Sequence, residues 1–131
     1  MRVSVIFPLL LLFCIVSCGN GETSSKVDPG GAAVHYIRSL ADGRYDEYIH
    51  AMVSCDSASD AYKKQMIVLH KQMVTTQKTE CGSLETVQCV RSELGREGKT
   101  ANVFLQLTYS NGMKEDIMLP LVWNNEKWRI R

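Results

Sequence analysis

The hydrophobic pattern of this chain changes its period once, at Cys81-Gly82-Ser83. Before this point apolar residues recur at the spacing of one helix face, and after it they alternate as in half-buried strands. A chain that makes helices first and an antiparallel meander afterwards belongs to the α+β class, because the strands can pack their apolar face on the helices. We therefore predict N-terminal helices packed on a curved four-stranded antiparallel sheet, in one domain over residues 28–131.

Three helices are predicted in the first half of the domain. Asp28-Pro29 has the residue types of an N-cap and a first helical position, and Asp42-Gly43 ends this helix after about four turns. A short second helix covers residues 45–52. The third and longest helix follows residues 57–60, which have the S-x-x-D form of a capping box. The stripe predicted to face the core comprises Ala58, Tyr62, Met66, Leu69 and Met73, and the solvated face carries Lys63, Lys64, Lys71 and Lys78.

Four strands are predicted in the second half. The first spans residues 84–93, and the second, over residues 100–109, has the clearest alternation in the chain. The Asn-Gly pair at 111–112 predicts a tight hairpin into a third strand that ends near Trp123. Residues 127–131 form a last short strand. The second strand places five side chains on one face: Ala101, Val103, Leu105, Leu107 and Tyr109.

The N-terminus has the pattern of an export signal. An apolar run over residues 3–16 follows one basic residue, Arg2, as in a secretory signal rather than in a membrane-spanning helix. The run ends in Ile15-Val16-Ser17-Cys18, which resembles the lipobox of bacterial lipoproteins. The resemblance implies a signal peptide over residues 1–17, cleavage before Cys18 and lipid on its thiol. The alternatives are an ordinary cleaved signal and an uncleaved anchor.

A polar, glycine- and serine-rich tether over residues 18–27 would then join the lipid to the domain. Two or three acyl chains hold a protein durably on a bilayer. We therefore expect a protein of the bacterial cell envelope whose partner is the membrane, reached through lipid on Cys18, with the outer membrane favoured over the inner one.

Charge excludes one large class of function. The chain of 131 residues has 15 Lys plus Arg and 14 Asp plus Glu, and removal of Arg2 with the signal leaves 14 of each. A balance of this kind provides no electrostatic footprint for nucleic acid. No nucleic-acid partner is therefore predicted.

The order of elements resembles that of a known superfamily. An Ala-x-Val strand from Ala101, the Asn-Gly turn, an acidic-to-apolar strand and the closing Trp128-Arg129-Ile130 are similar to the nuclear-transport-factor-2-like (cystatin-like) superfamily, in particular to Bacteroides-type lipoprotein domains of unknown function. The resemblance covers roughly Ala32 to Arg131. It implies a cone, in which a curved sheet wraps the helices, often with a pocket between them and frequently with a dimer through the outer sheet face.

Some members of that superfamily are isomerases or dehydratases that use Asp, His or Tyr in the cone to move a proton. The resemblance makes Tyr36, Tyr48, Asp46 and His50 the candidate pocket residues here. No catalytic residue is assigned, because no pairing among them is diagnostic. None of the three histidines lies at a recognised spacing from another ligand, so neither a metal site nor a cofactor is predicted.

The cysteines beyond Cys18 are Cys55, Cys81 and Cys89. Cys55 and Cys81 flank the third helix, which would hold them about 30 Å apart. A strand that returns antiparallel to the helix would bring Cys89 back toward Cys55. We therefore predict a Cys55–Cys89 disulfide, if there is any, with three unpaired thiols as the alternative.

Three hypotheses on function follow. The first is a non-enzymatic, lipid-anchored binding or interaction module. Such a module could form a homodimer or bind an envelope protein partner. The second is an enzyme with an acid/base pair in the cone, which requires titratable groups that converge inside a pocket. The third is an accessory subunit of an envelope complex, which requires an exposed apolar patch on the sheet.

Overall fold

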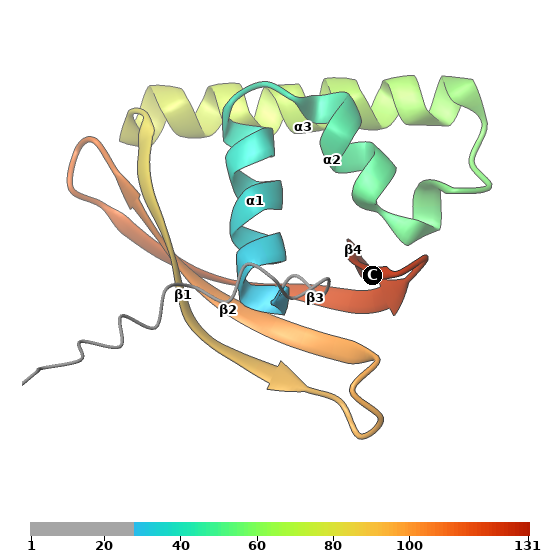
Figure 1. Cartoon of the computed structure of the whole chain (residues 1–131). Helices are drawn as coiled ribbons and strands as arrows, with labels where there is room; N and C mark the ends of the chain where they lie inside the picture. Colours follow the sequence, from blue (N-terminus) through green and yellow to red (C-terminus); the bar gives the residue numbers. More distant parts are fainter. Residues whose placement is uncertain (1–27) are drawn as a thin grey trace, which may run out of the picture.

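The computed structural model describes residues 28–131. The predicted signal peptide over residues 1–17 and the tether over residues 18–27, with Cys18, lie outside the described residues. Within them the chain forms three α-helices and then four strands, so the predicted α+β class is confirmed. Figure 1 shows α1 packed across the curved sheet, with α3 lying over one end of it.

The sheet is an antiparallel meander in the order β1-β2-β3-β4. Its strands are β1 (Leu84–Leu94), β2 (Thr100–Tyr109), β3 (Lys114–Asn124) and β4 (Lys127–Ile130), close to the ranges predicted from alternation. Every second residue of β2 is buried, from Ala101 to Tyr109. The sheet therefore has one apolar inner face and one outer face, as the period of two requires.

The turn between β3 and β4 uses unusual backbone angles. Asn125 has φ 52° and Glu126 has φ 61°, the two positive values that a two-residue type I′ hairpin needs. A non-glycine residue in this region carries a small conformational cost. The turn sets the pairing of Trp123 with Trp128, whose rings meet edge to face at 5.4 Å.

Helix α1 (Pro29–Ala41) packs against the inner face of the sheet. The Asp28 carboxylate caps it by accepting from the Gly31 N–H at 3.3 Å, as the Asp-Pro pair predicts. Its core side is built of small and aliphatic residues, which let the helix approach the strands closely. These are Ala32, Ala33, Ile37 and Leu40, all buried.

Helix α2 (Tyr45–Ala51) and a short 3-10 turn, η1 (Val53–Cys55), run beside β4. Met52 forms an isolated parallel bridge with Ile130. The link is reinforced by Arg129, whose side chain is only 5% exposed. Its guanidinium donates to both Asp56 carboxylate oxygens at 2.7 and 2.5 Å and to the His50 carbonyl at 2.8 Å. This buried cation joins the last strand to the second helix.

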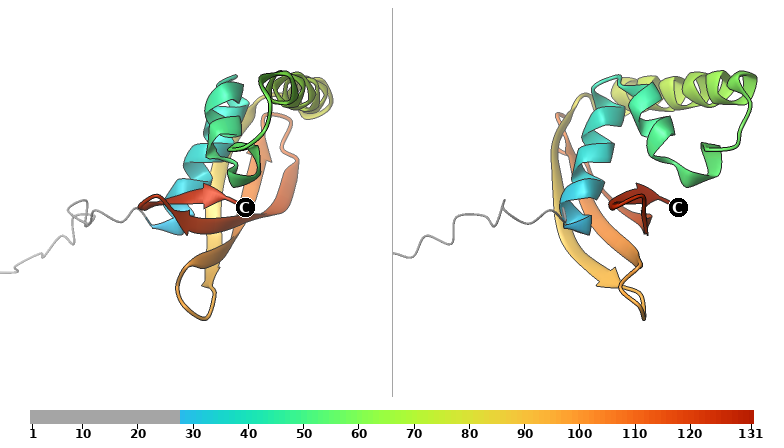
Figure 2. Two further views of the ribbon diagram at one scale, coloured as in Figure 1. Left: turned by 90° about the vertical axis from the view of Figure 1, so that its right-hand side faces the viewer. Right: turned by 45° about the vertical axis from the view of Figure 1, so that its right-hand side comes forward.

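Helix α3 (Asp60–Cys81) differs from the prediction in both its cap and its orientation. Ser59, rather than Ser57, caps it by accepting from the Tyr62 N–H at 3.2 Å. None of its residues is buried. Figure 2 shows this helix alongside the rest of the molecule rather than inside it.

The stripe predicted to face the core is therefore mostly wrong. Tyr62, Leu69 and Met73 are about half exposed, at 47%, 50% and 49%. The residues that pack against the core are Met66, Ile67, Val74 and Cys81, a set rotated around the helix from the predicted one. A 22-residue helix with apolar side chains on several sides has no single orientation fixed by its sequence, and here the sheet and α2 select it.

The hydrophobic core is built from side chains between Ala32 and Ile130 and lies between α1, α2 and the inner sheet face. Because this core is drawn from within the described range, we expect residues 28–131 to fold as a unit. Among these residues, no helix has the length and apolarity needed to cross a membrane.

Candidate ligand cavity

A cavity of about 510 Å³ opens between the C-terminal half of α1, the C-terminal half of α3 and the inner faces of β2 and β3. This volume lies within the range of about 300 to 1,000 Å³ that is usual for small-molecule sites. Its walls are predominantly aliphatic. The main apolar lining residues are Ile37, Leu40, Val74, Leu107, Ile117 and Leu119.

The polar lining residues include Tyr109 from β2, Glu115 from β3 and Gln77 from α3. The Gln77 amide donates to both Glu115 carboxylate oxygens, at 3.3 and 3.1 Å. Glu115 faces inward because it pairs with the buried Leu107 across the two strands. A charged side chain is thus held against the apolar wall by an amide from the opposite element.

Tyr109 carries the one buried side-chain oxygen or nitrogen in residues 28–131 that has no hydrogen-bond partner. The residue is 4% exposed, and its hydroxyl is shielded from solvent. Burial raises the pKa of Tyr109, and electrostatic interactions with Glu115 and Cys81 raise it further. The phenol is therefore protonated at neutral pH and can donate or accept one hydrogen bond.

The four predicted pocket residues do not converge. Tyr48 is buried, lines the cavity and lies against the His70 ring at 5.2 Å, and burial raises its pKa. Tyr36 points elsewhere and donates to the Trp128 carbonyl at 2.5 Å. Asp46 and His50 are exposed on α2 and are not part of the lining. Apart from Tyr48, these residues do not line the cavity: α2 turns Asp46 and His50 to solvent, and the Tyr36 hydroxyl of α1 is directed to β4.

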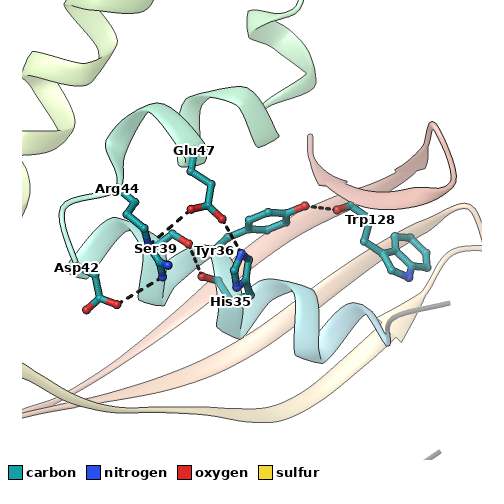
Figure 3. A network of polar contacts seen from close by, with 7 residues as sticks. All are labelled: His35, Tyr36, Ser39, Asp42, Arg44, Glu47 and Trp128. Atoms are coloured by element: carbon teal, nitrogen blue, oxygen red, sulfur yellow. Dashed lines mark hydrogen bonds and ion pairs between the residues drawn. The ribbon is translucent and has the colours of Figure 1, made fainter. Parts of the chain in front are cut away.

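A polar network joins α1 to α2 on the outside of the cone (Figure 3). His35 Nε2 lies 2.8 Å from Glu47, and Arg44 approaches Glu47 at 3.6 Å and Asp42 at 3.5 Å. The side chains of His35 and Glu47 are 54% and 42% exposed. Exposed pairs of this kind contribute at most about 1 kcal/mol each, and of these residues only Asp42 belongs to the cavity lining.

The three cysteines of the described range are free, and no Cys55–Cys89 disulfide is formed. Cys55 is buried in η1 next to β4, whereas Cys89 lies on β1 under the first turn of α1. β1 is the edge of the sheet opposite β4, three strand spacings or roughly 14 Å away, and η1 lies on the β4 side, where Met52 bridges to Ile130. A disulfide needs Cα atoms within about 7 Å. Burial raises the pKa of Cys89, with a further contribution from Asp28, so its thiol stays protonated.

The outer sheet face carries several exposed apolar side chains. Val90 and Met118 are 59% and 47% exposed, and the Arg91 guanidinium lies 3.9 Å from the centroid of the Phe104 ring. They border a shallow hollow together with Asp116. A homodimer or an envelope partner on this face stays a prediction. Within residues 28–131 no group of three or more His, Cys, Asp or Glu side chains is arranged to hold a metal ion.

The alternation of β2 predicts that Tyr109 lies on its apolar face, and neither Gln77 nor Glu115 is among the predicted site residues. One signal was present for Glu115. Glu115 lies two residues before Ile117 and four before Leu119, so strict alternation predicts that it is on the same inner face of β3. Gln77 could not be found in this way, because its position depends on the orientation of α3.

No protein-family model matches this chain, and no curated protein does either. A solved structure from Campylobacter jejuni, named "Putative NTF2-like transpeptidase", is similar with a TM-score of 0.64 and 15% sequence identity. The match covers 79% of this chain and 97% of that one. At this identity the likeness concerns the fold alone, so the α+β cone predicted from the sequence is confirmed as a nuclear-transport-factor-2-like fold.

Proposed function

We propose that this chain is a lipid-anchored module of the bacterial cell envelope that binds a small, mainly apolar ligand in its cone cavity. The observation that carries the binding role is the cavity itself, with aliphatic walls and a few convergent polar groups at one end. Such a combination is characteristic of sites that take apolar molecules with one polar group. The lipid anchor is supported by the Ile15-Val16-Ser17-Cys18 sequence.

The positions of the titratable residues support a binding role better than a catalytic one. The titratable residues expected for acid/base chemistry lie on different sides of the molecule, and the two acidic groups in the lining, Asp42 and Glu115, already interact with Arg44 and Gln77. In the described part of the chain no pair of lining side chains has the geometry of a general acid and base within hydrogen-bond reach.

Filling the cavity should abolish binding of an apolar probe. The fluorescence of N-phenylnaphthylamine rises in an apolar site, and we expect residues 28–131 to enhance it with a dissociation constant in the micromolar range. Val74→Trp places an indole in the cavity and should reduce this enhancement at least tenfold. The matched control is Val68→Trp on the same helix, because Val68 is 53% exposed and outside the lining.

Melting curves of both variants establish that they are folded. Loss of the signal in Val74→Trp alone supports the cavity. No enhancement by the parent domain, or an equal loss in both variants, would exclude the cavity as an apolar binding site.

The anchor has its own test in the full chain. In cells grown with labelled palmitate, the parent chain should incorporate the label and fractionate with membranes, whereas Cys18→Ser should lose at least nine-tenths of the label. Two buried acyl chains supply the membrane affinity that the rest of the chain does not need to provide. Cys55→Ser is the control, because this thiol is buried in η1. Full labelling of Cys18→Ser would contradict the proposal.

A further inference from the structure

One end of the cavity is polar and carries an acidic side chain, Glu115. Glu115 is half-buried, and its carboxylate receives hydrogen bonds only from the Gln77 amide among the described side chains. No lysine, arginine or histidine of residues 28–131 forms an ion pair with it. An ionised carboxylate can accept about four hydrogen bonds. Glu115 therefore retains acceptor capacity that faces the cavity lining.

The other charges of the lining do not neutralise this end. Asp42 is paired with Arg44 at 3.5 Å. Lys78 contributes to the lining but is exposed, so its ammonium lies where water and salt screen it. A charge-charge contact is stronger at a half-buried group than at an exposed one. A cation placed next to Glu115 would thus gain more than an anion placed next to Lys78.

Tyr109 provides a second, independent indication of a ligand. Its buried hydroxyl has no partner, a state that native proteins rarely leave unexplained. The ring belongs to the lining together with Tyr48, and the face of a tyrosine ring attracts cations. A rearrangement of the side chains that shield the phenol oxygen would let it accept a hydrogen bond from a group inside the cavity.

We infer that the ligand of this cavity is an apolar primary amine, whose ammonium binds Glu115 and Tyr109 while its hydrocarbon body lies against the aliphatic walls. This inference rests on the proposed binding function and names the chemical class of the ligand. Each polar group then has a role: Glu115 supplies charge, Gln77 orients the carboxylate from α3, and Tyr109 gains a partner.

The test uses three probes with one phenylbutyl body and different polar ends: 4-phenylbutylamine, 4-phenylbutanol and 5-phenylpentanoate. Calorimetric titration into residues 28–131 should give the tightest binding for the amine, at least fivefold over the alcohol and tenfold over the acid. Glu115→Gln should weaken amine binding about tenfold and leave alcohol binding within twofold.

The matched control is Asp116→Asn. Asp116 is the next residue of β3, but it lies on the outer face, where it accepts from Gln106. Equal effects of the two substitutions would assign the preference to the overall charge and overturn the inference. Tighter binding of the acid or the alcohol would overturn it as well, and tightest binding of the acid would indicate Lys78 instead.

Tyr109→Phe separates a ligand contact from a structural role. Removal of an unpartnered buried hydroxyl should raise the melting temperature of the unliganded domain, whereas amine affinity should fall severalfold. A rise in melting temperature with unchanged affinity would remove Tyr109 from the site.

The inference and the proposed function fail in different ways. If the three probes do not bind but N-phenylnaphthylamine does, the cavity binds apolar molecules and the amine is wrong. If none of the four compounds binds, both are wrong.

Discussion

Gly82→Ala should lower the free energy of unfolding by about 3 kcal/mol, the largest effect we expect from a single methyl group in this chain. Gly82 ends α3 with φ 83° and ψ −165°, a region open almost only to glycine. A Cβ atom there would lie 1.9 Å from Ser110 Oγ. That oxygen is held in place because it accepts from the Ser83 N–H at 3.0 Å, so it cannot retreat without breaking this hydrogen bond.

Gly98→Ala is the control for this prediction. Gly98 also has a positive φ, 68°, but a Cβ there meets nothing within 4 Å. Gly98→Ala should lower the free energy of unfolding by only about 1 kcal/mol, which is the cost of the backbone conformation without a steric clash. Chemical denaturation of both variants measures the difference, and equal losses would mean that the contact with Ser110 is not responsible.

The second large effect concerns Arg129 and Asp56, for which we expect unequal losses from the two partners. Asp56→Asn leaves a guanidinium that is 5% exposed without its counter-charge, whereas Arg129→Met leaves a carboxylate that is 52% exposed and that water can solvate. Removing the partner of a buried charge is the more costly change. Asp56→Asn should lower the melting temperature by roughly 10 °C or more, and Arg129→Met by roughly half as much. The reverse order would contradict the assignment of the buried charge to Arg129.

This pair also predicts a pH dependence. The hydrogen bond from Arg129 holds the pKa of Asp56 below its usual value, and the charge of the guanidinium adds to this effect against the opposing effect of desolvation. A depressed pKa in the folded state contributes stability that is present above the unfolded value near 4 and is lost as the pH falls through the folded value. The stability gap between the parent and Arg129→Met should therefore narrow from about pH 6 to about pH 3. A constant gap would show that the ion pair does not contribute through this ionisation.

Except for the start of α3, the boundaries of the elements were predictable because each is determined locally. Asp28 and Pro29 begin α1, Gly82 ends α3, and strict alternation defines β2, so the period of the sequence and the end signals agree. No distant contact is needed to infer them, and the α+β class follows from their order alone.

The disulfide pairing and the orientation of α3 could not be predicted, because both depend on the angles between consecutive helices and strands. The expected Cys55–Cys89 disulfide assumed that the chain returns along α3, but Figures 1 and 2 show β1 leaving the end of this helix at a steep angle. The packing of α3 against α2 and the sheet, which no local pattern determines, fixes which side of the helix meets the sheet. It therefore decides that Gln77 reaches Glu115 and that Leu69 remains exposed.

The position of α3 also determines how the cavity can exchange its contents. The helix is about 33 Å long and buries no residue completely, yet its C-terminal end is bonded to the β2–β3 turn through the Asn111 N–H and the Cys81 carbonyl. Elements with few buried contacts open at a lower free energy than the whole domain. Helix α3 is thus a wall of the cavity that has no fully buried residue and is held by the Gln77–Glu115 hydrogen bonds and by the contact of His70 with Tyr48. The rate at which a ligand leaves the cavity would then depend on the free energy of local opening of this helix. The sheet and α1 would remain folded during the exchange.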